Sequence, residues 1–183
     1  MTEEARVAAG SVLRETVLAD PRLTMGGTVA AYYSFGTEPD TRRLVFALWK
    51  HGAYVLLPVL RPDGDLDWAE YDGPDTLAPG ERVPLEPTGP RHGVDAVRRC
   101  AAVIVPALAV DLCGIRLGRG GGSFDRALAR AGAGTLTLAL AYDGEVVPEL
   151  PAEPHDTPVR AVATPSRGIQ ALPAGAGNPT PGG

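Results

Sequence analysis

A glycine-rich segment that also carries arginines and an aspartate combines the residue types of an anion site. It runs from Arg116 to Leu128 and reads RLGRGGGSFDRAL. Its glycines permit positive φ angles and let a phosphate approach main-chain N–H groups, and guanidinium groups pair bidentately with phosphate oxygens. Asp125 would repel a bare phosphate but suits a magnesium ion that bridges phosphates. The segment therefore predicts a site for a metal-bound nucleotide, with Arg116 and Arg119 as its cations.

The glycine spacing leaves simpler interpretations open. Gly118, Gly120, Gly121 and Gly122 match neither the dinucleotide fingerprint nor the phosphate loop that ends in Gly-Lys-Ser/Thr. A surface turn would contain the same glycines, and Asp125 would also be favourable as an acid in the first turn of a helix. The two arginines favour the anion site, because a surface turn has no need of cations beside its glycines.

The elements around this segment alternate between apolar strands and amphipathic helices. Hydrophobic periodicity predicts helices at 5–17, within 37–52, at 94–100 and at 124–132, and strands at 28–34, 53–60, 65–73, 101–110, 135–143 and 159–165. We expect strand 65–73 to be more exposed, strand 101–110 to be central, strand 159–165 to be the last, and residues 74–90 to form a long loop. This alternation predicts an α/β fold, a three-layer α/β/α sandwich with a mostly parallel central sheet. Ligands bind beyond the carboxyl ends of such strands, where we expect loops 36–41 and 152–158 to join the glycine-rich segment.

The composition bounds the class of protein. A chain of 183 residues with 44% hydrophobic content can bury one core, so we expect one domain over residues 1–170 and a disordered Gly/Pro/Ala tail over 171–183. A net charge of -5 argues against general nucleic-acid binding. Two cysteines without metal or disulfide spacing, and no signal or membrane segment, predict a cytoplasmic protein that does not bind membranes. We expect a monomer.

Two long segments, VIVPALAVDLCGIRLGRGGGSFDRAL and LALAYDGEVVPELPAEPHDTPV, resemble the signature half of the 5-formyltetrahydrofolate cyclo-ligase family, the methenyltetrahydrofolate synthetases. The resemblance extends through AYYSFGTEPDT, VLLPVL, GDLDWAEYD and LEPTG, so it covers residues 28–165. It implies a three-layer α/β/α sandwich that closes 5-formyltetrahydrofolate to 5,10-methenyltetrahydrofolate, with ADP and phosphate as the other products. A reduced folate and ATP are the implied substrates, and Mg²⁺ is the implied metal.

The resemblance also implies roles for individual residues. Arg119 and Asp125 would be catalytic, with Arg119 neutralising the transferring phosphoryl group, and Asp125 and Asp156 match the magnesium carboxylates. Glu38 matches an acid that contacts the folate. The implied ATP site comprises Arg116, Leu117, Gly118, Arg119, Gly120, Gly121, Gly122, Ser123 and Phe124, and the implied substrate site comprises Glu38, Trp68, Arg119 and Phe124.

A flat folate ring also needs an apolar wall. We interpret five residues as candidates for this wall: Tyr33, Leu57, Pro58, Trp68 and Tyr71. Packing in the core explains Trp68 and Tyr71 as well, and the burial preferences of aromatic side chains favour it.

Three features depart from the family pattern. The basic N-terminal stretch, a lysine followed by Leu-Arg, is not found, which predicts that the chain starts downstream of the family's usual start. The family usually has Gly-Tyr-Tyr-Asp at positions 122–125, and here Ser123 and Phe124 replace the two tyrosines. Arg160 stands where the family commonly has an acid. The alternative hypotheses are a folate- or nucleotide-binding relative that does not catalyse, and a sugar-phosphate or acyl-CoA protein of the same architecture.

Overall fold

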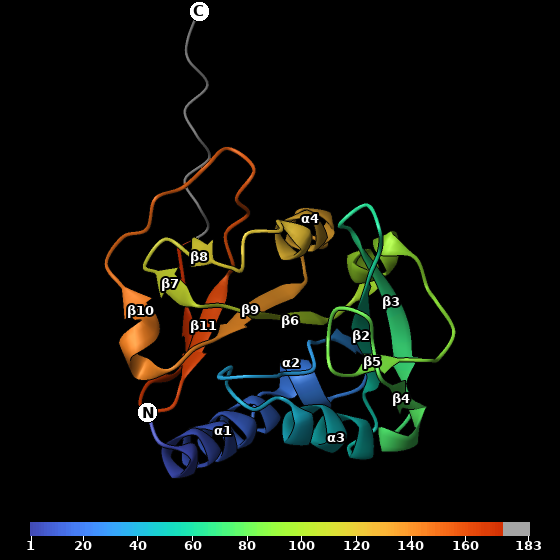
Figure 1. Cartoon of the computed structure of the whole chain (residues 1–183). Helices are drawn as coiled ribbons and strands as arrows, with labels where there is room; N and C mark the ends of the chain where they lie inside the picture. Colours follow the sequence, from blue (N-terminus) through green and yellow to red (C-terminus); the bar gives the residue numbers. More distant parts are fainter. Residues whose placement is uncertain (174–183) are drawn as a thin grey trace, which may run out of the picture.

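The central feature of the fold is a twisted sheet, shown in Figure 1. The computed structural model describes residues 1–173, and within them seven strands are hydrogen-bonded in the order β12-β11-β9-β6-β1-β2-β3. The five inner strands are mutually parallel, and β12 and β3 are antiparallel to their neighbours. The strands are β1 (Thr28–Ala30), β2 (Tyr54–Leu60), β3 (Leu66–Tyr71), β6 (Ala102–Pro106), β9 (Leu136–Leu140), β11 (Ala161–Thr164) and β12 (Gly168–Ala171). The predicted α/β class with a mostly parallel sheet is confirmed.

Helices cover both faces of this sheet (Figure 1). One face packs against α1 (Glu3–Leu18), α2 (Pro21–Thr24) and α3 (Arg42–Lys50), and the other against α4 (Ser123–Arg130) and the 3-10 helix η2 (Val94–Arg99). Successive residues of one strand serve opposite faces: Ile104 contributes to the α1–α3 side, whereas Val103 and Val105 contribute to the α4 side. Because side chains alternate along a strand, a strand covered on both sides must be apolar throughout, as β6 is.

Smaller elements lie at the ends and the edge of the sheet. A three-stranded sheet with the order β10-β7-β8 lies on the α4 side, and a short β4-β5 ladder follows the 3-10 helix η1 (Pro74–Thr76). A third 3-10 helix, η3 (Asp143–Glu145), precedes β10. The short strands are β4 (Leu77–Ala78), β5 (Glu86–Pro87), β7 (Ala109–Asp111), β8 (Arg116–Leu117) and β10 (Val146–Val147).

Four expectations about the strands are corrected. Strand β3 is not exposed, because Trp68 packs under η2 and α4 with none of its surface accessible. The run 101–110 forms two strands, β6 and β7, which belong to different sheets. Strand 28–34 is shorter than expected, since β1 ends at Ala30. The segment 159–165 is not the last strand, because β12 turns back and pairs antiparallel with β11.

The C-terminal boundary also differs from the expectation. Ala171 belongs to β12, and the Leu172 backbone N–H donates a 2.8 Å hydrogen bond to the Arg160 carbonyl. Of the expected disordered tail, Ala171 therefore belongs to the sheet and Leu172 is hydrogen-bonded to it, and residues 174–183 lie outside the described part of the chain. Among the described residues, no helix has the length and apolarity that crossing a membrane requires.

Candidate active site

Three loops meet around the glycine-rich segment. The first follows β1 and carries Glu38, the second is the glycine-rich loop between β8 and α4, and the third precedes β11. Contacts join the second loop and the start of α4 to both neighbours: Arg119 Nη2 lies 3.5 Å from Glu38 Oε1, and the Thr157 N–H donates a 3.2 Å hydrogen bond to Asp125 Oδ1. The predicted convergence of these loops is therefore observed.

A buried clamp fixes the loop that carries Glu38. The Thr41 hydroxyl donates to the Tyr32 carbonyl at 2.6 Å and accepts from the Ser34 N–H at 2.9 Å. The Ser34 hydroxyl in turn accepts from the Thr41 N–H at 2.9 Å. Thr41 and Ser34 are buried, so these bonds have no competition from water and hold both ends of the loop together.

Arg119 is the exposed cation of the site. Its guanidinium stacks over the Phe35 ring, 4.6 Å from the centroid, and its side chain is 55% exposed despite the contact with Glu38. Because water reaches the Arg119 guanidinium, its 3.5 Å contact with Glu38 is weakened, so Arg119 can exchange this partner for an anionic ligand.

Arg116 behaves differently from the expectation of a simple phosphate-facing cation. Only 8% of the residue is exposed, and its guanidinium lies 5.7 Å from the centroid of the Phe124 ring. Its Nη2 atom lies 3.5 Å from Asp125 Oδ1, and among the described residues its Nε has no hydrogen-bond partner. Burial lowers the pKa of Arg116, and the charges of Asp125 and Asp156 oppose that shift. Arg116 is therefore buried beside Asp125 rather than exposed at the surface.

The two predicted metal carboxylates come from different elements, Asp125 from α4 and Asp156 from the loop before β11. Asp156 Oδ2 accepts a 2.8 Å hydrogen bond from the Glu153 N–H, and His155 Nε2 lies 3.6 Å from its Oδ1. Within the described residues, no cluster of three or more His, Cys, Asp or Glu side chains is placed to hold a metal ion. Two carboxylates near the predicted phosphate loop would suit Mg²⁺, because this ion is commonly held by one or two carboxylates plus the substrate's phosphates.

Glu38 is nearly enclosed, with 9% of its side chain exposed. Burial raises the pKa of its carboxyl above the ordinary value of 4.5, while the hydrogen bond from the Phe35 N–H and the charge of Arg119 act in the opposite direction. When folding raises the pKa of an acid, the folded state binds the proton more tightly than the unfolded state does, so the protonated form of the acid stabilises the fold. Its ionisation therefore removes stability as pH rises from the ordinary value through the raised one.

From this sign we expect Glu38→Gln to raise the melting temperature at pH 7 by about 1–3 °C, and to have a smaller effect at pH 4. The amide keeps an oxygen that can accept from the Phe35 N–H and removes the buried charge. Thermal unfolding of both proteins at the two pH values measures this difference. A lower melting temperature for the variant at pH 7 would mean that the contact with Arg119 outweighs burial.

Of the remaining predicted site residues, some serve the scaffold. Trp68 is fully buried in the core, which favours the packing interpretation, and Leu57 and Tyr71 are buried too. Tyr33 and Tyr71 line a surface cavity of about 410 Å³ that includes no residue of the glycine-rich loop. Arg160 Nη1 donates to the carbonyls of Gly132 and Ala133, so its charge serves the turn before β9.

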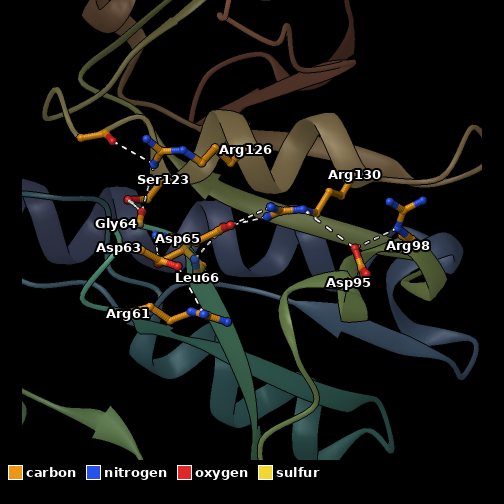
Figure 2. A network of polar contacts seen from close by, with 11 residues as sticks. Arg61, Asp63, Gly64, Asp65, Leu66, Asp95, Arg98, Ser123, Arg126 and Arg130 are labelled. Carbon is orange, nitrogen blue, oxygen red and sulfur yellow. Dashed lines mark hydrogen bonds and ion pairs between the residues drawn. The ribbon is translucent and has the colours of Figure 1, made fainter.

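Sequence reasoning missed the contacts that hold the glycine-rich loop from the other side. Figure 2 shows that side chains of α4 reach the turn between β2 and β3. The Ser123 hydroxyl, assigned above to the nucleotide, donates a 2.6 Å hydrogen bond to the Gly64 carbonyl. Arg126 donates to the same carbonyl at 3.0 Å and to the Gly121 carbonyl at 3.2 Å. The helical spacing of positions 123 and 126 was the available signal, but it does not identify the partner.

Both the sequence and the fold of this chain are similar to those of known proteins. Residues 1–165 match the model of the 5-formyltetrahydrofolate cyclo-ligase family. The chain is 43% identical to the 5-formyltetrahydrofolate cyclo-ligase of Mycolicibacterium smegmatis over 152 residues, which are 80% of this chain and 78% of that protein. It is 35% identical to the Escherichia coli protein of the same name over 170 residues, 91% of this chain and 93% of that one. The solved structure of Aquifex aeolicus 5,10-methenyltetrahydrofolate synthetase superimposes with a TM-score of 0.80 at 26% identity, covering 98% of this chain and 89% of that one.

Proposed function

The chain belongs to the 5-formyltetrahydrofolate cyclo-ligase family and is a ligase, and from this premise we propose how its site performs the reaction. The proposed reaction converts 5-formyltetrahydrofolate and ATP to 5,10-methenyltetrahydrofolate, ADP and phosphate, with Mg²⁺ bound to the nucleotide. One observation carries the proposal: the Arg119 guanidinium lies 3.5 Å from Glu38, so a cation of the glycine-rich loop meets the acid of the neighbouring loop. The substrates are small molecules, whereas a monomeric state and a cytoplasmic location stay predictions.

The chemical difficulty is that a formamide oxygen is a poor leaving group. Transfer of the γ-phosphoryl group to that oxygen forms an O–P bond and releases ADP. N10 of the folate then attacks the formyl carbon, the C–O bond breaks, phosphate leaves, and N10 loses its proton. Because phosphoryl transfer depends on positioning and charge neutralisation, the chain needs cations and backbone donors rather than a covalent nucleophile.

The described residues can be assigned to these tasks. The backbone of residues 117–122 and the N-terminal end of α4 supply donors for the phosphates, and Arg119 neutralises the phosphoryl group as it transfers. Asp125 and Asp156 would hold Mg²⁺, which would neutralise phosphate charge when bound. Glu38 would accept hydrogen bonds from pterin N–H groups, and Phe124, half-buried beside Arg116, offers an apolar surface.

The absorbance of 5,10-methenyltetrahydrofolate tests the proposal directly. With 5-formyltetrahydrofolate, ATP and Mg²⁺ we expect continuous product formation, and omission of ATP or addition of excess EDTA should abolish it. Folate binding without product in the complete mixture would contradict the proposal and identify a relative that binds but does not catalyse. Product formation unaffected by EDTA would contradict the metal assignment alone.

A further inference from the structure

We propose that the turn between β2 and β3, residues 61–65, is a positioning element for the nucleotide loop, with Ser123 and Arg126 as its contacts. The proposal rests on the function proposed above, because it assigns the turn to the same nucleotide site. It goes further by giving a role to a turn that lies more than fifty residues earlier in the chain and belongs to a different strand pair.

The contacts come from one face of α4 (Figure 2). Ser123, Arg126 and Arg130 are spaced by three and four residues, so they lie along one side of the helix. Ser123 Oγ and Arg126 Nη1 both donate to the Gly64 carbonyl, at 2.6 and 3.0 Å. Arg130 forms a bidentate pair with Asp65, with Nη1–Oδ1 at 2.7 Å and Nη2–Oδ2 at 2.6 Å. The helix is therefore joined to the turn by residues at its start, its middle and its end.

The turn presents a fixed carbonyl to these donors. Gly64 has a φ of +84°, a conformation that glycine adopts without strain. The Arg61 N–H donates to the Asp65 carbonyl at 2.8 Å, and the Gly64 N–H donates to the Arg61 carbonyl at 3.0 Å. The Asp65 N–H donates to Asp63 Oδ1 at 3.0 Å. Because these bonds within the turn fix its backbone, the Gly64 carbonyl is held in one position as a hydrogen-bond acceptor.

Arg126 links the Gly64 carbonyl to the nucleotide loop. The same Nη1 that binds Gly64 also donates to the Gly121 carbonyl at 3.2 Å. Four of the five residues from 118 to 122 are glycines, which lose more conformational freedom on ordering than other residues do. Contacts that order residues 121–123 before ATP arrives reduce the entropy that binding must overcome. We therefore expect the turn to affect nucleotide affinity more than folding.

Two variants and two measurements test this role. For Ser123→Ala and for Arg126→Ala we expect the KM for ATP to rise about five- to tenfold, while the KM for 5-formyltetrahydrofolate stays within twofold. In the ligand-free protein, the NMR order parameters of the amides at 118–122 should fall, while those in β6 stay unchanged. Ser123→Thr keeps the hydroxyl and should restore both values.

Arg61→Ala is the matched control. Arg61 belongs to the same turn, but its side chain pairs with Asp63 at 3.2 Å and not with α4, so its removal should leave both measurements unchanged. Unchanged order parameters at 118–122 in the two test variants would overturn the proposal. An equal fall at 118–122 and in β6 would overturn it too, because that pattern means a general loosening of the fold. If the wild type forms no methenyltetrahydrofolate, the proposed function fails, yet the order parameters still decide whether the turn orders the loop.

Discussion

Arg119→Ala should lower kcat for methenyltetrahydrofolate formation by about a thousandfold, the effect expected when a cation that stabilises a transferring phosphoryl group is removed. The variant should stay folded. Arg119 is half-exposed, but its partner Glu38 is nearly enclosed, so we expect the loss of their contact to cost about 1–2 kcal/mol, too little to unfold the domain. Steady-state kinetics at saturating ATP and folate, together with thermal unfolding, measure the two quantities separately.

The matched variants separate charge from geometry. Arg119→Lys keeps the positive charge but not the planar fork that pairs with two phosphate oxygens, so we expect it to recover part of the lost rate. A complication is Glu38, which loses the cationic contact with Arg119 in Arg119→Ala and can then perturb folate binding. Combining Arg119→Ala with Glu38→Gln removes that orphaned charge. A kcat within threefold of wild type in Arg119→Ala would exclude the assigned role.

The fold was predictable where hydrophobic pattern alone determines structure. Strand β6 is apolar on both faces, and the sequence therefore placed it correctly at the centre of the sheet. Strand β3 alternates polar and apolar residues, which predicts an exposed strand, but η2 and α4 cover its apolar face completely. Strand β12 has the sequence GIQA, and nothing in such a short, partly polar segment distinguishes it from a loop before its pairing with β11 is seen.

The site was predictable to the extent that its residues are close in sequence. Glycine spacing and flanking arginines predicted a phosphate loop, a role that stays a prediction, but they did not predict that Arg116 is buried beside Asp125. The pair between Asp65 and Arg130 spans 65 residues and leaves no local signal in either segment. In the sequence, such paired charges cannot be told from ordinary surface charges. The contacts between α4 and the turn at 61–65 could therefore be found only from the three-dimensional structure.

Asp125→Asn should lower kcat/KM for ATP by about a hundredfold and raise the Mg²⁺ concentration needed for half-maximal rate. The amide is nearly the same size and can still accept the hydrogen bond from the Thr157 N–H, so the loop before β11 keeps its contact with α4. What is lost is negative charge at the position where the metal is proposed to bind. Titration of the rate with Mg²⁺ at fixed ATP measures this loss.

The stability of the same variant decides whether the loss is chemical. Removing the charge weakens the contact with buried Arg116, for which we expect a cost of about 1–2 kcal/mol, with Asp156 still nearby. A domain stable by about 5–15 kcal/mol remains almost fully folded after such a loss, so unfolding cannot account for a hundredfold fall in rate. Asp95→Asn, which changes an exposed carboxylate paired with Arg98, is the control and should alter neither quantity. If Asp125→Asn loses stability and activity in equal proportion, with an unchanged Mg²⁺ requirement, then Asp125 serves to balance Arg116 and the metal must be held elsewhere.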